Sequence, residues 1–209
     1  MATYSSELVT VLKRYIDSMG EGRDRLTELL KNTSVDIRYS LLMNVRGGIF
    51  SRWTGLHSGA CANDLETIKY MLDNFLCDQK CDVVKIQASN MRTALHFAAA
   101  YGYTSIINYL LNNLSQQQKY DLLKIQDENG NTALHRAAIN KEVEAVPAII
   151  SAVSSPLLIQ LLNIKNKEGQ TVTDIRPELH DELPVLISQG IIFMRSVNNQ
   201  TSNIDRLLH

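Results

Sequence analysis

The stretch Thr93-Ala94-Leu95-His96-Phe97-Ala98-Ala99-Ala100-Tyr101-Gly102 sets the pattern for the whole chain. Thr93 can cap a helix because its side-chain oxygen can accept a hydrogen bond from a backbone N–H of the first turn. The small residues that follow allow a second helix to approach closely, and Gly102 can take the left-handed conformation that commonly ends a helix. The stretch therefore predicts a short, capped helix that packs closely against a neighbour.

The same pattern recurs every 39 residues. Thr-Gly-Leu-His-Ser-Gly-Ala begins at Thr54, Thr-Ala-Leu-His-Arg-Ala-Ala begins at Thr132, and a shorter relative, Thr-Val-Thr-Asp, begins at Thr171. A fixed period is the signature of a repeat array, which grows by stacking similar units and not by closing a single core. We expect one structural domain with repeat units at 54–92, 93–131, 132–170 and 171–190.

Each full unit has the same predicted plan: an inner helix that begins at the Thr, a second helix, a short third helical segment and a polar turn. The second helices are expected at 64–72, 104–111 and 143–153, with Pro147 marking a bend or a late start in the last. The polar turns are expected at 87–92, 126–131 and 165–170. Asn129-Gly130 and Glu168-Gly169 are tight-turn signals within them.

Both ends of the chain are predicted to cap the stack. Residues 1–53 contain helical patterns at 5–19, 23–31 and 34–44 and then a linker, and we interpret them as a degenerate first unit that forms a helical N-terminal cap. The unit at 171–190 is expected to hold an inner and an outer helix, interrupted by two prolines. Residues 191–209 begin apolar and become polar, which predicts a C-terminal cap that frays at its end.

Composition excludes several classes of function. A net charge of −1 and a sequence pI near 6.5 provide no basic surface for nucleic acid. No apolar run approaches the roughly 20 residues of a membrane span, and the N-terminus lacks a signal-peptide pattern. Three cysteines fit a reducing compartment better than a disulfide framework. We therefore expect a cytoplasmic protein that binds no nucleic acid and does not insert into a membrane.

The order of helix, turn, helix and polar turn, with Thr-Ala-Leu-His opening the first helix, resembles the ankyrin repeat. Residues 127–138, Asp-Glu-Asn-Gly-Asn-Thr-Ala-Leu-His-Arg-Ala-Ala, match the family motif at the Asp, Gly, Thr, Leu, His and paired Ala. The resemblance covers roughly 54–190. It implies an all-α helical repeat solenoid with polar turns between the units.

The chain departs from the family pattern in two ways. The usual Pro after the Thr is replaced by Gly55, Ala94, Ala133 and Val172. The period also exceeds the usual length of about 33 residues by about six. The added residues lie before the turn, in the third helical segment, so the units are lengthened systematically. Similar long ankyrin units occur in proteins of host-associated bacteria and of some invertebrates, which is a hint about the source.

Three histidines, His57, His96 and His135, are the candidates for metal binding or acid–base chemistry. They lie on separate units, about 10 Å apart in a stack of helices, which is too far for shared ligation. The resemblance implies that each His instead bonds to the Thr and nearby backbone and fixes the junction between turn and helix. The structural signature then comprises Thr54, His57, Thr93, His96, Gly102, Gly130, Thr132, His135, Gly169 and Thr171.

A cysteine pair and a glycine pair resemble ligand-binding motifs but lack the residues that such motifs need. Cys77 and Cys81 lie one helical turn apart, but a zinc site needs about four ligands and there is no second Cys pair. Cys81 falls in an apolar register of its helix, so packing explains it. Gly47-Gly48 lacks the strand, the Lys and the Ser/Thr of a phosphate-binding loop. The sequence predicts no metal, no cofactor and no catalytic residue.

The resemblance implies a surface that binds another protein through the concave face of the solenoid. The matching positions on the turns are Ser89, Asn90, Arg92, Glu128, Asn129, Asn131, Lys167 and Gln170, and those on the inner helices are Ala62, Tyr101 and Asn140. Tyr101 is the best single anchor, because it is amphipathic and follows small residues.

A second candidate surface lies just before the first clear unit. Ile49, Phe50 and Trp53 occur there between Arg46 and Arg52, and Trp and Arg are the residue types that most often anchor interfaces. The alternative is that these residues pack under the N-terminal helices and join them to the repeats. Burial is the favoured interpretation, because a lone large aromatic residue is usually substantially buried.

We expect a monomeric, non-catalytic scaffold for protein–protein interaction. The alternatives are a bacterial effector delivered into a host cytoplasm, the targeting module of a larger enzyme system, and a self-associating structural protein. Repeat surfaces vary freely on a constant fold, so the sequence does not identify the partner.

Overall fold

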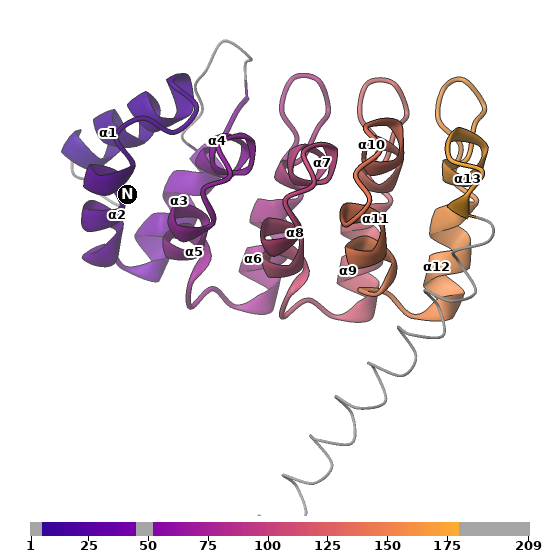
Figure 1. The fold of residues 1–209 in the computed structure, drawn as a ribbon. Helices are drawn as coiled ribbons and strands as arrows, with labels where there is room; N and C mark the ends of the chain where they lie inside the picture. Colours follow the sequence, from indigo (N-terminus) through magenta and orange to yellow (C-terminus); the bar gives the residue numbers. More distant parts are fainter. Residues whose placement is uncertain (1–5, 45–51, 180–209) are drawn as a thin grey trace, which may run out of the picture.

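A computed structural model describes residues 6–44 and 52–179, which contain thirteen α-helices and no β-strand (Figure 1). The helices are α1 (Ser6–Asp17), α2 (Arg23–Lys31), α3 (Val35–Asn44), α4 (Gly55–Cys61), α5 (Leu65–Leu72), α6 (Cys77–Val84), α7 (Ala94–Ala100), α8 (Thr104–Leu111), α9 (Gln116–Leu123), α10 (Ala133–Ile139), α11 (Ala145–Ile150), α12 (Ser155–Leu162) and α13 (Val172–Ile175). The predicted all-α helical repeat solenoid is confirmed.

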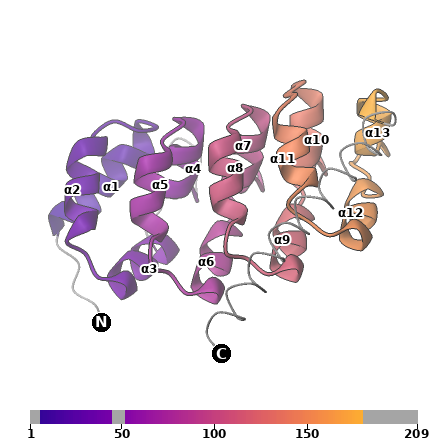
Figure 2. The ribbon, with the colours of Figure 1, turned by 60° about the horizontal axis from the view of Figure 1, so that its bottom comes forward.

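The helices stack in three rows (Figures 1 and 2). The inner row is α1, α4, α7, α10 and α13; the outer row is α2, α5, α8 and α11; the third row is α3, α6, α9 and α12. Each full unit adds one helix to each row, so the third helix accounts for the unusual length of the unit. Helices α1, α2 and α3 pack against α4, α5 and α6 as the helices of one later unit pack against those of the next.

The predicted second helices agree with α5 and α8, but α11 is shorter than expected at both ends. It begins at Ala145 and not at Val143, which confirms a late start near Pro147. Pro147 is the third residue of α11, and its missing N–H costs no hydrogen bond in the first turn of a helix. In the fourth unit the inner helix α13 has only four residues. The outer helix predicted in this unit and the tail predicted at 191–209 lie outside the described residues, which end at residue 179.

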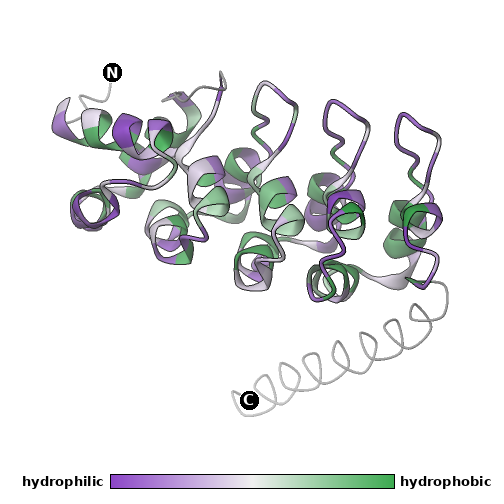
Figure 3. Ribbon diagram, turned by 45° about the horizontal axis from the view of Figure 1, so that its top comes forward, coloured by the Kyte–Doolittle hydropathy of each residue, from purple (hydrophilic) through white to green (hydrophobic). Residues whose placement is uncertain are grey.

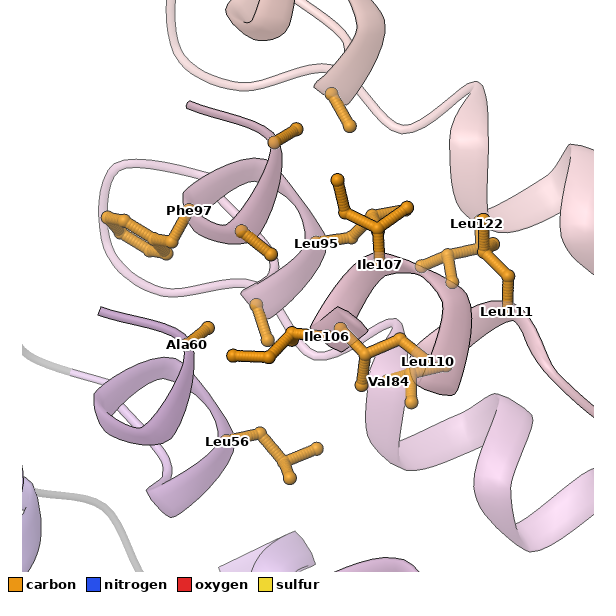
Figure 4. Close-up of a cluster of buried hydrophobic side chains, with 14 of the residues drawn as sticks. Leu56, Ala60, Val84, Leu95, Phe97, Ile106, Ile107, Leu110, Leu111 and Leu122 are labelled. Carbon is orange, nitrogen blue, oxygen red and sulfur yellow. The ribbon is translucent and has the colours of Figure 1, made fainter. Parts of the chain in front are cut away.

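The apolar core runs continuously between the rows. Figure 4 shows Leu56 and Ala60 of α4 on one side of the cluster, next to the side chains of α7 and α8, and Val84 of α6 and Leu122 of α9 on the opposite side. Leu95, Ile106, Ile107 and Leu110 are fully buried in this cluster. Since burial of one such side chain contributes about 1.5–3 kcal/mol, the stability of each unit depends on the neighbour that covers it.

A buried Thr–His pair begins the inner helix of each full unit. In α7 the backbone N–H of Thr93 donates to Nδ1 of His96 at 3.2 Å, and the Thr93 hydroxyl lies 2.9 Å from the same nitrogen. Equivalent contacts join Thr54 to His57 and Thr132 to His135. Because Nδ1 accepts from a backbone N–H, the ring proton lies on Nε2.

The Nε2 atom of each histidine reaches the polar turn that closes its unit. It lies 3.1 Å from the carbonyl oxygen of Arg92 for His57, 3.2 Å from that of Asn131 for His96, and 3.2 Å from that of Gln170 for His135. Each of these carbonyls belongs to the residue just before the next Thr. The predicted bonds to the Thr and nearby backbone are present, and they also tie the inner helix of every full unit to the polar turn that closes the unit.

Burial keeps these rings neutral. The pKa of His96 is lowered to about 4 because the ring is fully buried, and burial also lowers the pKa of His135. A neutral ring with one donor and one acceptor nitrogen matches the two hydrogen bonds that each histidine makes. At pH 7 both rings are therefore fixed structural groups.

The polar turns bond to one another through their backbones and extend side by side from one edge of the stack (Figure 1). The N–H of Glu128 donates to the carbonyl of Asn90 at 3.1 Å, and the N–H of Lys167 donates to that of Asn129 at 3.0 Å. Gly130 allows this close approach, since a Cβ there would lie 2.7 Å from the Lys167 nitrogen. The predicted tight turn at Asn129-Gly130 is confirmed.

The two turn glycines offer a matched test of this packing. Gly130 and Gly169 both have positive φ, 74° and 77°, but a Cβ at Gly169 meets no atom of the described residues within 4 Å. We expect Gly169→Ala to cost about 1 kcal/mol through its left-handed backbone alone. Gly130→Ala should cost clearly more, since it also forces adjacent turns apart. Urea unfolding of the two variants measures the difference, and equal losses would contradict the tight turn-to-turn packing.

The buried histidines predict acid sensitivity. An unfolded chain binds a proton at His96 as the pH falls below its ordinary value of 6.5, whereas the folded chain does so only near 4. The stabilisation is therefore complete above pH 6.5 and is lost as the pH falls towards 4. Between pH 7 and pH 5 we expect the free energy of unfolding to fall by about 2 kcal/mol from His96 alone.

His96→Asn is the matching control for this titration. The Asn oxygen can still accept from Thr93, as the carboxylate of Asp174 accepts from the N–H of Thr171 at 2.8 Å in the last unit. The variant loses the bond to Asn131 and should be less stable at pH 7 by about 1 kcal/mol. Its urea midpoint should depend less on pH than that of the wild type, and an identical pH dependence in both proteins would exclude His96 as the source.

Candidate functional site

We use the term inner surface for the polar turns together with the exposed residues of the inner helices. The turns are largely hydrophilic, whereas the apolar residues lie mainly on the helices (Figure 3). Two large apolar side chains at the helix ends are nevertheless exposed. Tyr101 is 51% exposed and Ile139 is 41% exposed. They follow one another on the inner row, at the ends of α7 and α10.

Most of the predicted contact residues are accessible. Ser89, Glu128, Asn129, Lys167, Tyr101 and Asn140 are exposed, and Asn90, Arg92, Gln170 and Ala62 are half-buried. Phe50, like Ile49, lies outside the described residues. Asn131 and Trp53 are buried, with exposed fractions of only 5% and 3%, so neither side chain is accessible to a partner on the surface of the structure.

Asn131 is buried because its polar groups serve the stack. Its N–H donates to Oδ1 of Asp127 at 3.0 Å, and its carbonyl lies 3.2 Å from Nε2 of His96. Its side-chain oxygen accepts from Nδ2 of Asn166 in the next turn at 3.2 Å. These contacts occupy the residue in links to its own turn and inner helix and to the turn of the next unit.

Trp53 is buried, as the favoured interpretation of the linker predicted, but its neighbours were not anticipated. Its ring centroid lies 5.1 Å from that of Phe97 and 5.9 Å from that of His57. Phe97 belongs to α7 of the second unit, so Trp53 contacts the repeats directly. Arg52 beside it is exposed and has a positive φ of 72°.

Tyr101 is held in a defined position at the end of α7. Its N–H donates to the carbonyl of Phe97 at 3.1 Å, and Gly102 follows with a φ of 70°, as the sequence predicted for the end of this helix. The ring stacks on Tyr103 with a centroid distance of 5.6 Å and an interplanar angle of 28°. An aromatic side chain that is exposed but already ordered loses little further freedom on binding.

Asn140 occupies the equivalent position in the next unit but has a structural role. Its Nδ2 donates to the carbonyl of Ala100 at 2.6 Å and so joins the ends of α10 and α7. The third equivalent residue, Ala62, is small and half-buried. Of the three predicted helix-end contacts, Tyr101 therefore offers the largest exposed apolar group.

A buried carboxylate at the base of the second turn joins two arginines. Oδ1 of Asp127 accepts from the N–H groups of Asn129 at 2.9 Å and Asn131 at 3.0 Å. Oδ2 accepts from Nε of Arg92 at 3.3 Å and from Nε of Arg136 at 2.6 Å, and Nη2 of Arg136 pairs with it as well. Burial raises the pKa of Asp127, but the arginine and the backbone donors outweigh it and hold the pKa below the usual value.

The sequence pointed to only part of this cluster. Asp127 was recognised as part of the repeat motif, and Arg92 was named as a contact residue. Arg136 was missed because it lies 44 positions after Arg92. The two arginines come together on Asp127 only when their units stack on either side of the unit that contains it. The signal that could have revealed the pair is the position of the two cations. Arg136 directly follows the Thr-Ala-Leu-His of its unit, and Arg92 directly precedes the Thr of the unit before.

A buried lysine on the third row was also missed. Nζ of Lys80 donates to the carbonyls of Tyr109 and Asn112, both at 2.7 Å, where α8 ends. Burial lowers its pKa to about 8. In the preceding unit the guanidinium of Arg38 donates to the carbonyl of Tyr70, the residue equivalent to Tyr109. Both cations therefore cap the C-terminal end of an outer helix, where positive charge is favourable.

The cysteines of the described ranges differ in their exposure. Cys81 is buried, in agreement with its predicted packing role, and Cys77 is exposed. Within residues 6–44 and 52–179 no three His, Cys, Asp or Glu side chains gather closely enough to hold a metal ion. None of the helices in the same ranges has the length and apolarity needed to cross a membrane.

Comparisons with known proteins identify the family. A family model for ankyrin repeats (three copies) matches residues 18–121 and again 56–157, which together cover more than half of the chain. The match begins well before residue 54, where the resemblance was expected to start, and includes α2 and α3. No curated protein matches the sequence. With its recurrent Thr–His pairs, stacked turns and helical rows, the chain belongs to the ankyrin-repeat family.

Proposed function

We propose that this protein is a non-catalytic scaffold that binds a partner protein through its inner surface. Ankyrin repeats are protein–protein interaction modules, and that general role follows from the family. The observation that carries the specific proposal is the exposure of Tyr101 and Ile139 at the ends of the adjacent inner helices α7 and α10. Both follow inner-helix residues that are otherwise almost entirely buried.

The chemistry of these two residues suits an interface. A tyrosine presents a large apolar face with a polar tip, which is why the residue is common at binding surfaces. Stacking on Tyr103 orders the ring before a partner arrives. The turns beside it supply the exposed polar groups of Glu128, Asn129 and Lys167, which match the polar rim of a typical protein interface.

The rest of the molecule supports a structural role for its polar side chains. The histidines, Asp127, Asn131 and Lys80 all bond to backbone groups or ion partners that hold the units together. We place the protein in the cytoplasm, where its three free thiols are compatible with a reducing environment. We also propose that it acts as a monomer.

Affinity purification with the full chain tests the surface. The baits are the wild type, Tyr101→Arg and the control Leu76→Arg, which places the same charge on an apolar residue that is 72% exposed at the start of α6, in the third row. We expect at least one protein captured by the wild type to be lost with Tyr101→Arg and kept with Leu76→Arg. A charge at a residue that becomes buried at the centre of an interface removes most of the binding energy of that residue.

Circular dichroism and thermal melting of the three baits provide the folding control. Tyr101 lies at the end of α7 and is half exposed, so its substitution should leave the helix content unchanged. Capture of the same proteins in the same amounts by all three baits would show that binding does not use this part of the inner surface.

A further inference from the structure

Two arginines on the inner surface share one carboxylate. Arg92 and Arg136 both bond to Oδ2 of Asp127, and together the three groups carry one excess positive charge. The carboxylate side chain has no exposed area, whereas the side chains of Arg92 and Arg136 are 25% and 14% exposed. The part of this cluster that faces solvent is therefore cationic.

The cationic cluster has unused hydrogen-bonding capacity. A guanidinium carries five N–H donors in a planar fork. Arg92 donates to Asp127 through Nε, and its guanidinium carbon lies 5.7 Å from the centre of the Phe97 ring. Its terminal nitrogens remain available for a planar, two-point contact, which is the arrangement that arginine makes with a carboxylate.

The exposed apolar residues lie close to this cluster on the same face. Ile139 follows Arg136 by three residues on α10, and Tyr101 follows Phe97 by four residues at the end of α7. Residues three or four apart share one face of a helix and lie about 5–6 Å from each other. The inner surface thus presents a cationic site and an apolar site that are separated by one helical turn.

We propose that the inner surface binds an acidic segment of the partner protein, with an Asp or Glu carboxylate between Arg92 and Arg136 and a nearby apolar side chain on Tyr101 and Ile139. This inference rests on the proposed function and names the chemistry of the partner. The excess positive charge selects an anion, and the adjacent apolar residues favour a peptide over a nucleic acid, in agreement with the overall charge of −1.

Selection from a display library of random peptides tests the proposal with the full chain as the target. The peptides are fused at their C-termini, so that any carboxylate comes from a side chain. We expect the enriched peptides to combine Asp or Glu with a neighbouring Leu, Ile or Phe. Enrichment without acidic residues, or no enrichment at all, would overturn the proposal.

Variants of the cluster then change the affinity of one enriched peptide in opposite directions. Arg92→Gln removes one cation and leaves Asp127 paired with Arg136, so binding should weaken about tenfold. Asp127→Asn removes the competing carboxylate and should tighten binding. The fold tolerates Asn at this position, since Oδ1 of the equivalent Asn166 accepts from the N–H groups of Glu168 and Gln170 at 3.0 and 2.9 Å.

Glu128→Gln is the matched control for net charge. It alters the total charge by the same amount as Asp127→Asn, but at the exposed tip of the turn. Fluorescence anisotropy at physiological salt should show a change of less than about twofold for this variant, because an exposed charge is screened. Equal tightening by Glu128→Gln and Asp127→Asn would overturn the proposal, since the arginine cluster would then have no special part.

The same titrations separate the two levels of the hypothesis. A peptide that is released by Tyr101→Arg but binds Arg92→Gln like the wild type would refute the acidic contact and leave the inner surface as the binding site. A peptide that binds both variants like the wild type would refute both proposals. Thermal melting of each variant establishes that it is folded before its affinity is compared.

Discussion

The hydrogen bond from Nε2 of each inner-helix histidine to the carbonyl before the next Thr sets the geometry of the stack. The imidazole is fully buried at His96, so both of its nitrogens need partners, and one of them comes from the polar turn that closes the unit. The interval between a histidine and its carbonyl partner is the same in all three full units. An insertion within that interval in a single unit would shift the carbonyl and leave a buried donor without an acceptor. This explains why the added residues of this chain appear in every full unit, as a complete helix.

The third row of helices brings its own links between units. Each added helix has to bury an apolar side and to meet its neighbour, and buried cations make part of that contact. Lys80 of α6 caps the end of α8 in the next unit, and Arg38 of α3 caps the end of α5 in the same way. Burying a cation is costly without hydrogen bonds, but the unpaired carbonyls at a helix C-terminus supply them. The third row is therefore an integral part of the solenoid.

Local signals in the sequence predicted local structure well. The Thr at the start of each inner helix, the turn at Asn129-Gly130 and the end of α7 at Gly102 depend on a few adjacent residues, and all lie at the predicted positions. The predicted bond from a first-turn N–H to the Thr hydroxyl is found at Thr132 and Thr171, whereas at Thr93 the hydroxyl contacts the His96 ring. The errors concern contacts between units. Asn131 has the composition of an exposed turn residue, yet its carbonyl and side chain bond to residues 35 positions away on either side. Trp53 packs on Phe97, 44 positions later. Such partners depend on which helices stack and in what register, and a single sequence shows neither.

The candidate binding surface follows from what remains after these structural links are made. Along the inner row the Thr–His pairs are fixed by buried hydrogen bonds, whereas the helix-end position holds Ala62, Tyr101 and Asn140 in successive units. The side-chain amide of Asn140 donates to Ala100 of the neighbouring unit, and Ala62 has a small side chain that offers little surface. The same contrast holds one turn earlier, where Ser58 is buried, Phe97 covers Trp53 and Arg136 shares Asp127 with Arg92. Exposed apolar area and excess charge therefore coincide between the second and third full units. The proposed binding surface therefore lies on those two units, and the units on either side cover their apolar faces.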